Sequence, residues 1–496
     1  MHISDVRNFN RCPKLYRLSI QDKNYHSFPY FNISINTTES VCHKLGIIEH
    51  FEGKPNDNNE DTFKGLEEYQ WLTNVRFVYR GLRVKIPFVY HEGNNLQIYF
   101  SSLTLFPNDS DMTNICWSVQ VLEKLGFKVT DIYLVHLNAE YIREDELDDQ
   151  QLWVVSDSFY TGKGNPNRKV IESVRKYNLN IDEYLDYLLH FEGEDVSEER
   201  SNRCTGKNKC RYYDVCFPQE KELPDNSILT LTSSQNKYSM YHDGLEYLKD
   251  ADWERLEGTH AQYAQIMADK NGGLYFEQAT LNSWLNKVES PKMSFVDFEW
   301  DLFPIPPYHD MAPMQVLPFQ YSLDVMEDGN ITHYEYIGEG DCRKEFVENL
   351  LRDLPEEGTI FAYNARGAEI VRLREFQKVF PEYEEELENV INRVVDLALP
   401  FINGLVYDVR MRGLYSLKII HDMIDKKNSY HDLEIENGLE AVEIYRRLDS
   451  ATPEEKEEYY RELYKYCGLD SYAMVEVYQW LENLTEGNNP QNAEWR

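Results

Sequence analysis

Two carboxylates interrupt an otherwise apolar run in the segment FVDFEW, residues 295–300. Side chains two residues apart on a strand point to the same face, so Asp297 and Glu299 project together while their aromatic and aliphatic neighbours face away. Two carboxylates this close repel each other and resist losing their water unless a positive charge lies between them. A hard divalent cation such as Mg²⁺ or Mn²⁺ prefers oxygen ligands, and the pair therefore predicts a metal site. A solvated strand face is the alternative interpretation of so short a pattern.

Two more acids lie in positions that could complete such a site. Glu369 follows TIFAYN and opens a predicted helix, AEIVRLREFQKVF. Asp470 belongs to the helical pattern YKYCGLDSYAMVEVYQWL, where Tyr466 precedes it by one helical turn and shares its face. Four acids and a tyrosine suffice for a two-metal site that hydrolyses phosphodiesters, with the ions about 3.5–4 Å apart. We therefore predict one pocket that gathers all four carboxylates.

The same segments resemble the DnaQ-like (DEDD) 3′–5′ exonucleases of the RNase H-like fold. FVDFE resembles the first motif, AYNARGAE the second, VVDL and SLKII the intervening segments, and YCGLD the third in its tyrosine-bearing form. The resemblance implies that Tyr466 positions the attacking water. It also implies the set of metal ligands, which would be Asp297, Glu299, Glu369 and Asp470.

The second motif departs from the family pattern, which usually reads N-x-x-F-D. Here the acid follows Asn364 by five residues instead of four, and it is Glu369, with Ala368 where the family has Phe. A glutamate is one methylene longer than an aspartate, so an altered backbone could still deliver its oxygens. We interpret the nearby Asp396, in VVDL, as structural.

Four cysteines form a second candidate site. Cys204, Cys210 and Cys216 are separated by five residues each in RCTGKNKCRYYDVCFP, and Cys12 lies far earlier in NRCPKLY. Three close cysteines and one remote cysteine predict a four-thiolate site for a [4Fe–4S] cluster or, alternatively, Zn²⁺. Unrelated thiols are the remaining interpretation. The other four cysteines lie in apolar surroundings, which predicts core thiols.

The segments around these cysteines resemble the ends of iron–sulfur PD-(D/E)XK nucleases, such as the CRISPR-associated adaptation nuclease. The resemblance implies that one early and three late cysteines clamp the two ends of the domain together. The catalytic residues of that family are missing, because Pro87 replaces its Asp and Ser118 replaces a helical Gln. Its E-x-K motif is replaced by Ile98, Tyr99 and Phe100. We expect a domain that keeps its fold and cluster, does not cut, and docks nucleic acid or a protein partner.

The length and composition of the chain favour more than one domain. Its 496 residues, 42% of them hydrophobic, are too many for one ordinary core. Strand-like and helical patterns alternate, which predicts α/β domains. We expect a PD-(D/E)XK-like mixed sheet with helices over residues 1–220, a helical connector over 221–290 and an RNase H-like α/β domain over 291–496. The whole arrangement also resembles an uncharacterised bacterial domain family.

The net charge of −35 argues against a broad basic surface for nucleic acid, although basic residues confined to one groove remain compatible with it. No run of eighteen apolar residues predicts a membrane span, and the first residues lack the apolar region of a secretion signal. The sequence therefore predicts a cytoplasmic protein without a membrane partner.

We expect a divalent-metal-dependent 3′–5′ exonuclease that acts on the 3′ ends of DNA or RNA. The alternative is a non-catalytic nucleic-acid-binding or assembly protein in which both nuclease-like domains are inert. A cluster that senses redox state is a third possibility, and no sequence motif of its own supports it.

Overall fold

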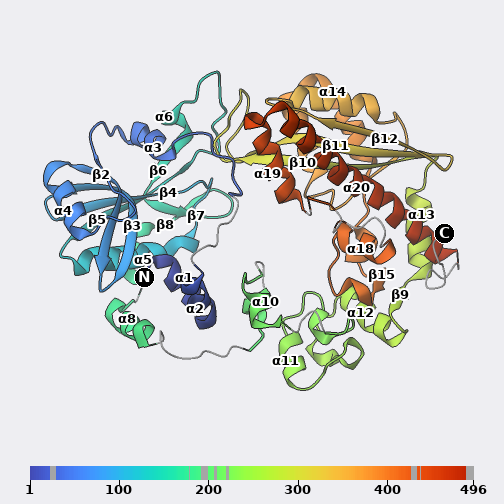
Figure 1. Cartoon of the computed structure of the whole chain (residues 1–496), viewed down its shortest axis with the longest axis horizontal. Helices are drawn as coiled ribbons and strands as arrows, with labels where there is room; N and C mark the ends of the chain where they lie inside the picture. The colour runs from blue at the N-terminus through green and yellow to red at the C-terminus, as the bar shows by residue number, and fades with distance from the viewer. Residues whose placement is uncertain are drawn as a thin grey trace. The chain divides into compact units, whose positions relative to one another are not determined.

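The chain forms two compact units in the computed structural model (Figure 1). The structure describes residues 1–22, 29–177, 179–190, 199–205, 209–218, 223–425, 430, 433–435 and 437–486. The first unit comprises Met1–Glu199, Arg203–Cys216 and Leu302–Gln315; the second comprises Arg200–Asn202, Phe217–Asp301 and Val316–Arg496. Each unit combines helices with a mixed sheet, so the predicted α/β class is confirmed.

The first unit is built on a six-stranded sheet in the order β1-β2-β3-β4-β5-β6. β1 pairs with β2, and β4 with β5, in parallel; the other neighbours are antiparallel. Apolar residues on both faces of these strands are buried, so the sheet needs helices on both sides. The strands are β1 (Phe51–Glu52), β2 (Trp71–Tyr79), β3 (Leu82–Glu92), β4 (Asn95–Ser101), β5 (Lys128–Leu137) and β6 (Trp153–Ser156).

Two hydrophobic clusters cover the two faces of this sheet. One cluster packs side chains such as Ile86 and Ile98 against α1 (Ile3–Arg11), α5 (Met112–Lys124), α7 (Val170–Lys176) and α8 (Ile181–His190). The other packs Phe88 and Tyr99 against α3 (Thr37–Leu45). Because successive side chains of a strand point to opposite faces, neighbouring residues of β3 and β4 belong to different clusters.

The second unit is built on a five-stranded sheet in the order β12-β11-β10-β13-β14. β10, β13 and β14 run parallel, whereas β11 and β12 form an antiparallel pair. The segment FVDFEW lies in β10, so the predicted strand is confirmed, and β10 is the central strand of the sheet. The strands are β10 (Lys292–Phe303), β11 (Gln315–Glu327), β12 (Asn330–Ile337), β13 (Thr359–Ala362) and β14 (Val394–Asp396).

Helices cover both faces of this second sheet. Val296 and Phe298 of β10 pack against α14 (Arg343–Asp353), α15 (Glu369–Val379) and α16 (Glu384–Arg393). Phe295 joins the opposite cluster, which contains α13 (Gln278–Val288), α18 (Leu417–Ile424) and the long α20 (Pro453–Thr485). Because side chains alternate along β10, Asp297 and Glu299 lie on the same face as Phe295 and therefore on the side of α18 and α20.

The segment expected to be a separate connector belongs to the second unit. Within residues 223–290, α12 (His260–Lys270) and α13 contribute Ile266 and Leu281 to the core that also contains α20. β9 (Leu274–Phe276) pairs antiparallel with β15 (Val406–Asp408). Its helices carry enough apolar surface to join a core, which a polar connector would not. Residues 302–315, expected in the C-terminal domain, belong to the first unit.

A substitution at Gly413 tests the packing of residues 223–290 on the core of the second unit. A Cβ at this position would lie 1.9 Å from the carbonyl oxygen of Thr230. Its φ of 78° is in the left-handed region, as is that of Gly329 (φ 76°), where no atom would lie within 4 Å of a Cβ. We expect Gly329→Ala to cost about 1–2 kcal/mol of backbone strain. Gly413→Ala should cost about 1–3 kcal/mol more through overpacking. Equal losses of stability in thermal denaturation would contradict the packing of this segment on the core.

Candidate active site

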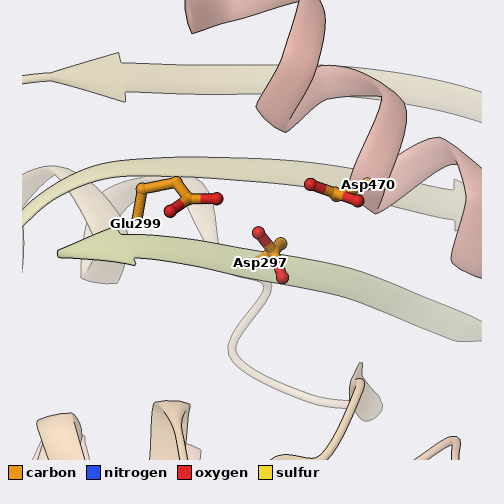
Figure 2. Close-up of side chains that lie close together, drawn as sticks. All are labelled: Asp297, Glu299 and Asp470. Atoms are coloured by element: carbon orange, nitrogen blue, oxygen red, sulfur yellow. The ribbon is translucent and has the colours of Figure 1, made fainter. Parts of the chain in front are cut away.

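Three carboxylates from two distant parts of the chain meet at one point. One oxygen of each of Asp297, Glu299 and Asp470 lies within 4.8 Å of the others. Asp297 and Glu299 project from β10, and Asp470 faces them from α20 (Figure 2). Three of the four predicted ligands therefore share a site that could hold a cation, as the residue pattern predicts.

Glu369 lies near these three acids but is not a member of the group. It is the first residue of α15 and is only 2% exposed. Its Oε2 is buried without a hydrogen-bond partner, and its charge raises the pKa of both Asp297 and Glu299. A buried carboxylate oxygen without a donor is costly, which makes Glu369 a suitable additional ligand for a cation beside the trio.

A tight turn absorbs the extra residue of the second motif. Asn364 adopts a left-handed conformation (φ 58°), and its carbonyl accepts a hydrogen bond from the N–H of Gly367. Asp396 accepts hydrogen bonds from the N–H groups of Asn364 and Ala398, at 3.0 Å each. Asp396 thus anchors the start of the turn that leads to Glu369, in agreement with its interpretation as structural.

Burial and mutual repulsion disfavour the charged forms of the site acids. Burial, followed by the charges of Asp470 and Glu299, raises the pKa of Asp297 well above its ordinary value. Burial is also the main cause that raises the pKa of Glu299 and that of Glu369 to about 8. A bound divalent cation would reverse this effect, because it favours the ionised carboxylates.

Two aromatic hydroxyls and one ammonium group contact the acid cluster. Tyr430 donates a hydrogen bond to Asp470 Oδ1 at 2.7 Å. Lys418 Nζ donates to the hydroxyl of Tyr466 at 2.8 Å. Tyr466 lies beside Asp470, as their spacing predicts. Burial is the largest effect on the pKa of Asp470 and raises it, whereas a hydrogen bond from Tyr466 lowers it. Lys418 thus brings a positive charge to the site, next to the hydroxyl of Tyr466.

Sequence reasoning missed Lys418, Tyr430 and the position of Cys467. Lys418 lies in SLKII, where the helical pattern gives no sign of a polar neighbour. Cys467 was expected to be a core thiol; it is buried, but its Sγ also lies 3.9 Å from Asp297 Oδ2. Its place between Tyr466 and Asp470 in the sequence was the signal that could have revealed it.

The four predicted cluster cysteines also converge, all within the first unit. Cys12 separates α1 from α2 (Pro13–Gln21), and the N–H of Cys210 donates to the carbonyl of Cys204 at 2.8 Å. Burial raises the pKa of the Cys216 thiol, and the other three cysteines raise it further. Each of the other three thiols therefore lies near Cys216, although the described residues contain no group of three cysteine Sγ atoms within 4.8 Å of one another.

The positions of the missing nuclease motif are parts of an apolar core. Ile98 of β4 is fully buried, and Phe100 packs against the same cluster. Pro87 lacks an N–H, and opposite it in β2 Asn74 leaves the strand pairing with a φ of 52°. Ser118 donates its hydroxyl to the carbonyl of Asn114 within α5. These side chains offer no ligand set for a hard cation.

Comparisons with known proteins identify relatives without a described activity. Residues 294–416 match the family described as a domain of unknown function (DUF2779). The chain is also similar to the uncharacterized protein MG366 of Mycoplasma genitalium, with 25% identity over 232 residues. That region covers 42% of this chain and 34% of the relative, so the chain spans about a third of its length. No solved structure matches the chain.

The family match contains Asp297, Glu299 and Glu369 and ends before Tyr466 and Asp470. Among the residues that the structure describes, no helix is long and apolar enough to cross a bilayer.

The raised pKa values predict how the metal-free protein responds to pH. The pKa of Glu299 is about 8 in the folded state and 4.5 ordinarily, so the folded state retains a proton that the unfolded chain has lost. This contribution to stability is fully present below about pH 4.5 and is lost as the pH rises through 8. The Glu299→Gln side chain does not titrate, so this variant should become more stable than the wild type as the pH rises. Each kcal/mol of difference in unfolding free energy should raise its denaturation temperature by about 2–4 °C relative to the wild type.

Thermal denaturation in chelator at pH 5.5 and pH 8.5 measures this difference. Mn²⁺ should raise the denaturation temperature of the wild type more than that of Glu299→Gln, because it binds the folded site. Glu457→Gln, at an exposed position of α20, is the matched control and should behave as wild type. A stability difference that does not change with pH would contradict the burial of this charge.

Proposed function

We propose that the protein is a divalent-metal-dependent 3′–5′ exonuclease, a hydrolase of the phosphodiester bonds of DNA or RNA. The observation that carries this proposal is the convergence of Asp297, Glu299 and Asp470 within 4.8 Å, from a central strand and a long helix. The order and type of these residues resemble the DnaQ-like exonucleases of the RNase H-like fold. The direction of cleavage rests on that resemblance.

The donor set fits Mg²⁺ or Mn²⁺. All candidate ligands are carboxylate oxygens, which hard cations prefer, and Glu369 adds a buried oxygen without a hydrogen-bond partner. Asp297, Glu299 and Asp470 would hold one ion, and Glu369 would contribute to a second. When bound, the ions would supply Lewis acidity for phosphodiester hydrolysis.

The remaining side chains of the site have roles that follow from their contacts. Tyr430 fixes one oxygen of Asp470 and leaves the other for a cation. Tyr466 presents its hydroxyl beside Asp470, where the resemblance implies that it positions the attacking water. The protein groups thus orient the reactants, which is the main contribution a protein makes to this reaction class.

Digestion of labelled oligonucleotides tests the proposal. Wild-type protein with Mn²⁺ should shorten a 5′-labelled strand stepwise and release labelled mononucleotides at once from a 3′-labelled strand. Asp297→Ala should lower the rate at least about 100-fold, because a lost ligand removes several kcal/mol of transition-state stabilisation.

Asp449→Ala, at an exposed position outside the site, is the control and should leave the rate unchanged. DNA and RNA, single- and double-stranded, are compared in parallel. Intact substrates with all four nucleic acids, or equal rates for wild type and Asp297→Ala, would refute the proposed activity.

We further propose that Cys12, Cys204, Cys210 and Cys216 bind a [4Fe–4S] cluster, and that the first unit docks nucleic acid or a protein partner without cutting. In a tetrahedral zinc site, Zn–S bonds of about 2.3 Å place the sulfurs about 3.8 Å apart. Among the described residues, no three cysteine Sγ atoms lie within 4.8 Å of one another, which favours a cluster over a single zinc ion. A cytoplasmic location is part of this proposal, because cysteines in that compartment usually act as thiols or metal ligands.

Metal content tests the cluster. Protein purified without oxygen should contain about four iron atoms per chain and absorb visible light. Cys210→Ser should lose the iron and denature at a lower temperature, because ligation joins the two ends of the first unit. Cys116→Ser replaces a buried thiol of α5 and should retain the iron. Stoichiometric zinc without iron would contradict the cluster.

A further inference from the structure

The helix α18 places a positive charge in direct contact with the proposed catalytic residues. Lys418 Nζ lies 4.4 Å from the ring centroid of Tyr466 and 4.8 Å from that of Tyr430. Its charge acts on the carboxylates too, because it lowers the pKa of Asp297 and Glu299 against the larger effect of burial. Lys418 therefore belongs to the same site as the acids.

The contacts of Lys418 fix the hydroxyl of Tyr466. A phenol has one proton to donate and lone pairs that accept. An ammonium group can only donate, so Lys418 occupies a lone pair of Tyr466 at 2.8 Å. The phenolic proton must then point elsewhere, and a hydrogen bond from Tyr466 favours ionised Asp470. Lys418 thus limits the directions in which the Tyr466 hydroxyl can donate, and Asp470 lies one helical turn away on α20.

The charge of Lys418 is unfavourable for cation binding. An ammonium group beside a metal site repels the cation and weakens its binding. If Lys418 served only to neutralise the acids, it would compete with the ions that the site is proposed to bind. Its contact with Tyr466 offers a different reason for its position.

Resting on the proposed function, we propose that Lys418 is a positioning residue for hydrolysis, which holds the Tyr466 hydroxyl in the orientation that directs the attacking water. Lys418 itself contacts Tyr466 and acts through it. The role requires the donor at Nζ and the geometry of α18 against α20, whose side chains share one core.

Lys418→Met tests this role with two readouts that move in opposite directions. The rate constant kcat of nuclease cleavage should fall about 10–100-fold, as for other residues that orient a catalytic group. The affinity for Mn²⁺ alone, measured by electron paramagnetic resonance of the free ion, should be at least as high as in wild type. A merely structural role would weaken Mn²⁺ binding and thermal stability together, and this result would overturn the proposal.

Two further variants complete the test. Lys418→Gln keeps an N–H donor without the charge and should retain more activity than Lys418→Met. If the Lys418→Met protein does not fold, Lys418→Gln is measured in its place. Lys465→Met removes the exposed lysine that pairs with Glu462 on α20 and should leave kcat unchanged. Equal loss in both lysine-to-methionine variants would contradict a specific role of Lys418.

A double-mutant cycle with Tyr466→Phe identifies the route of action. Because Lys418 acts through Tyr466, the double variant should be about as slow as Tyr466→Phe alone. Multiplied losses would show independent roles and overturn the proposal. An inactive wild type would instead contradict the proposed function itself, whereas an active wild type with an unimpaired Lys418→Met contradicts this inference alone.

Discussion

The repulsion between buried carboxylates is the constraint on which the second unit depends. Asp297 and Glu299 cannot move apart, because β10 is the central strand of its sheet and is packed on both faces. Asp470 cannot turn away either, since α20 contributes buried side chains along much of its length. The apolar packing of the surrounding layers thus holds the carboxyl groups together, and a cation that binds between them offsets the cost of ionising them.

Long-range contacts hold the site together. Tyr430 and Asp470 are 40 residues apart in the sequence, and Lys418 and Tyr466 are 48 apart. The helices that carry the second pair rest on a core to which residues 223–290 also contribute, partly through the pairing of β9 with β15. The supposed connector is therefore part of the support for α18 and α20, and a cut after residue 290 would expose their packing surface.

Local periodicity explains what the sequence could predict. The alternation in FVDFEW places two acids on one face of β10, and the spacing of Tyr466 and Asp470 places both on one side of α20. Glu369 was expected to begin a helix, and it does so. The contacts of Lys418 and Tyr430 were not predictable, because they depend on how separate elements pack. The convergence of Cys12 with the late cysteines came from a family resemblance, since spacing alone cannot bring remote residues together.

The second unit buries a group of carboxyl side chains, whereas the corresponding core of the first unit is apolar. In the first unit, Ile98 and Phe100 add apolar surface to the core and present no carboxylate that a cation would have to neutralise. The second unit retains its acids, although burial raises their pKa values, in a chain whose net charge is −35. Such a pocket repels a phosphodiester unless positive charge is present within it. Under the proposed function, bound cations and Lys418 are the groups that would offset this repulsion, and substrate binding would then follow cation binding.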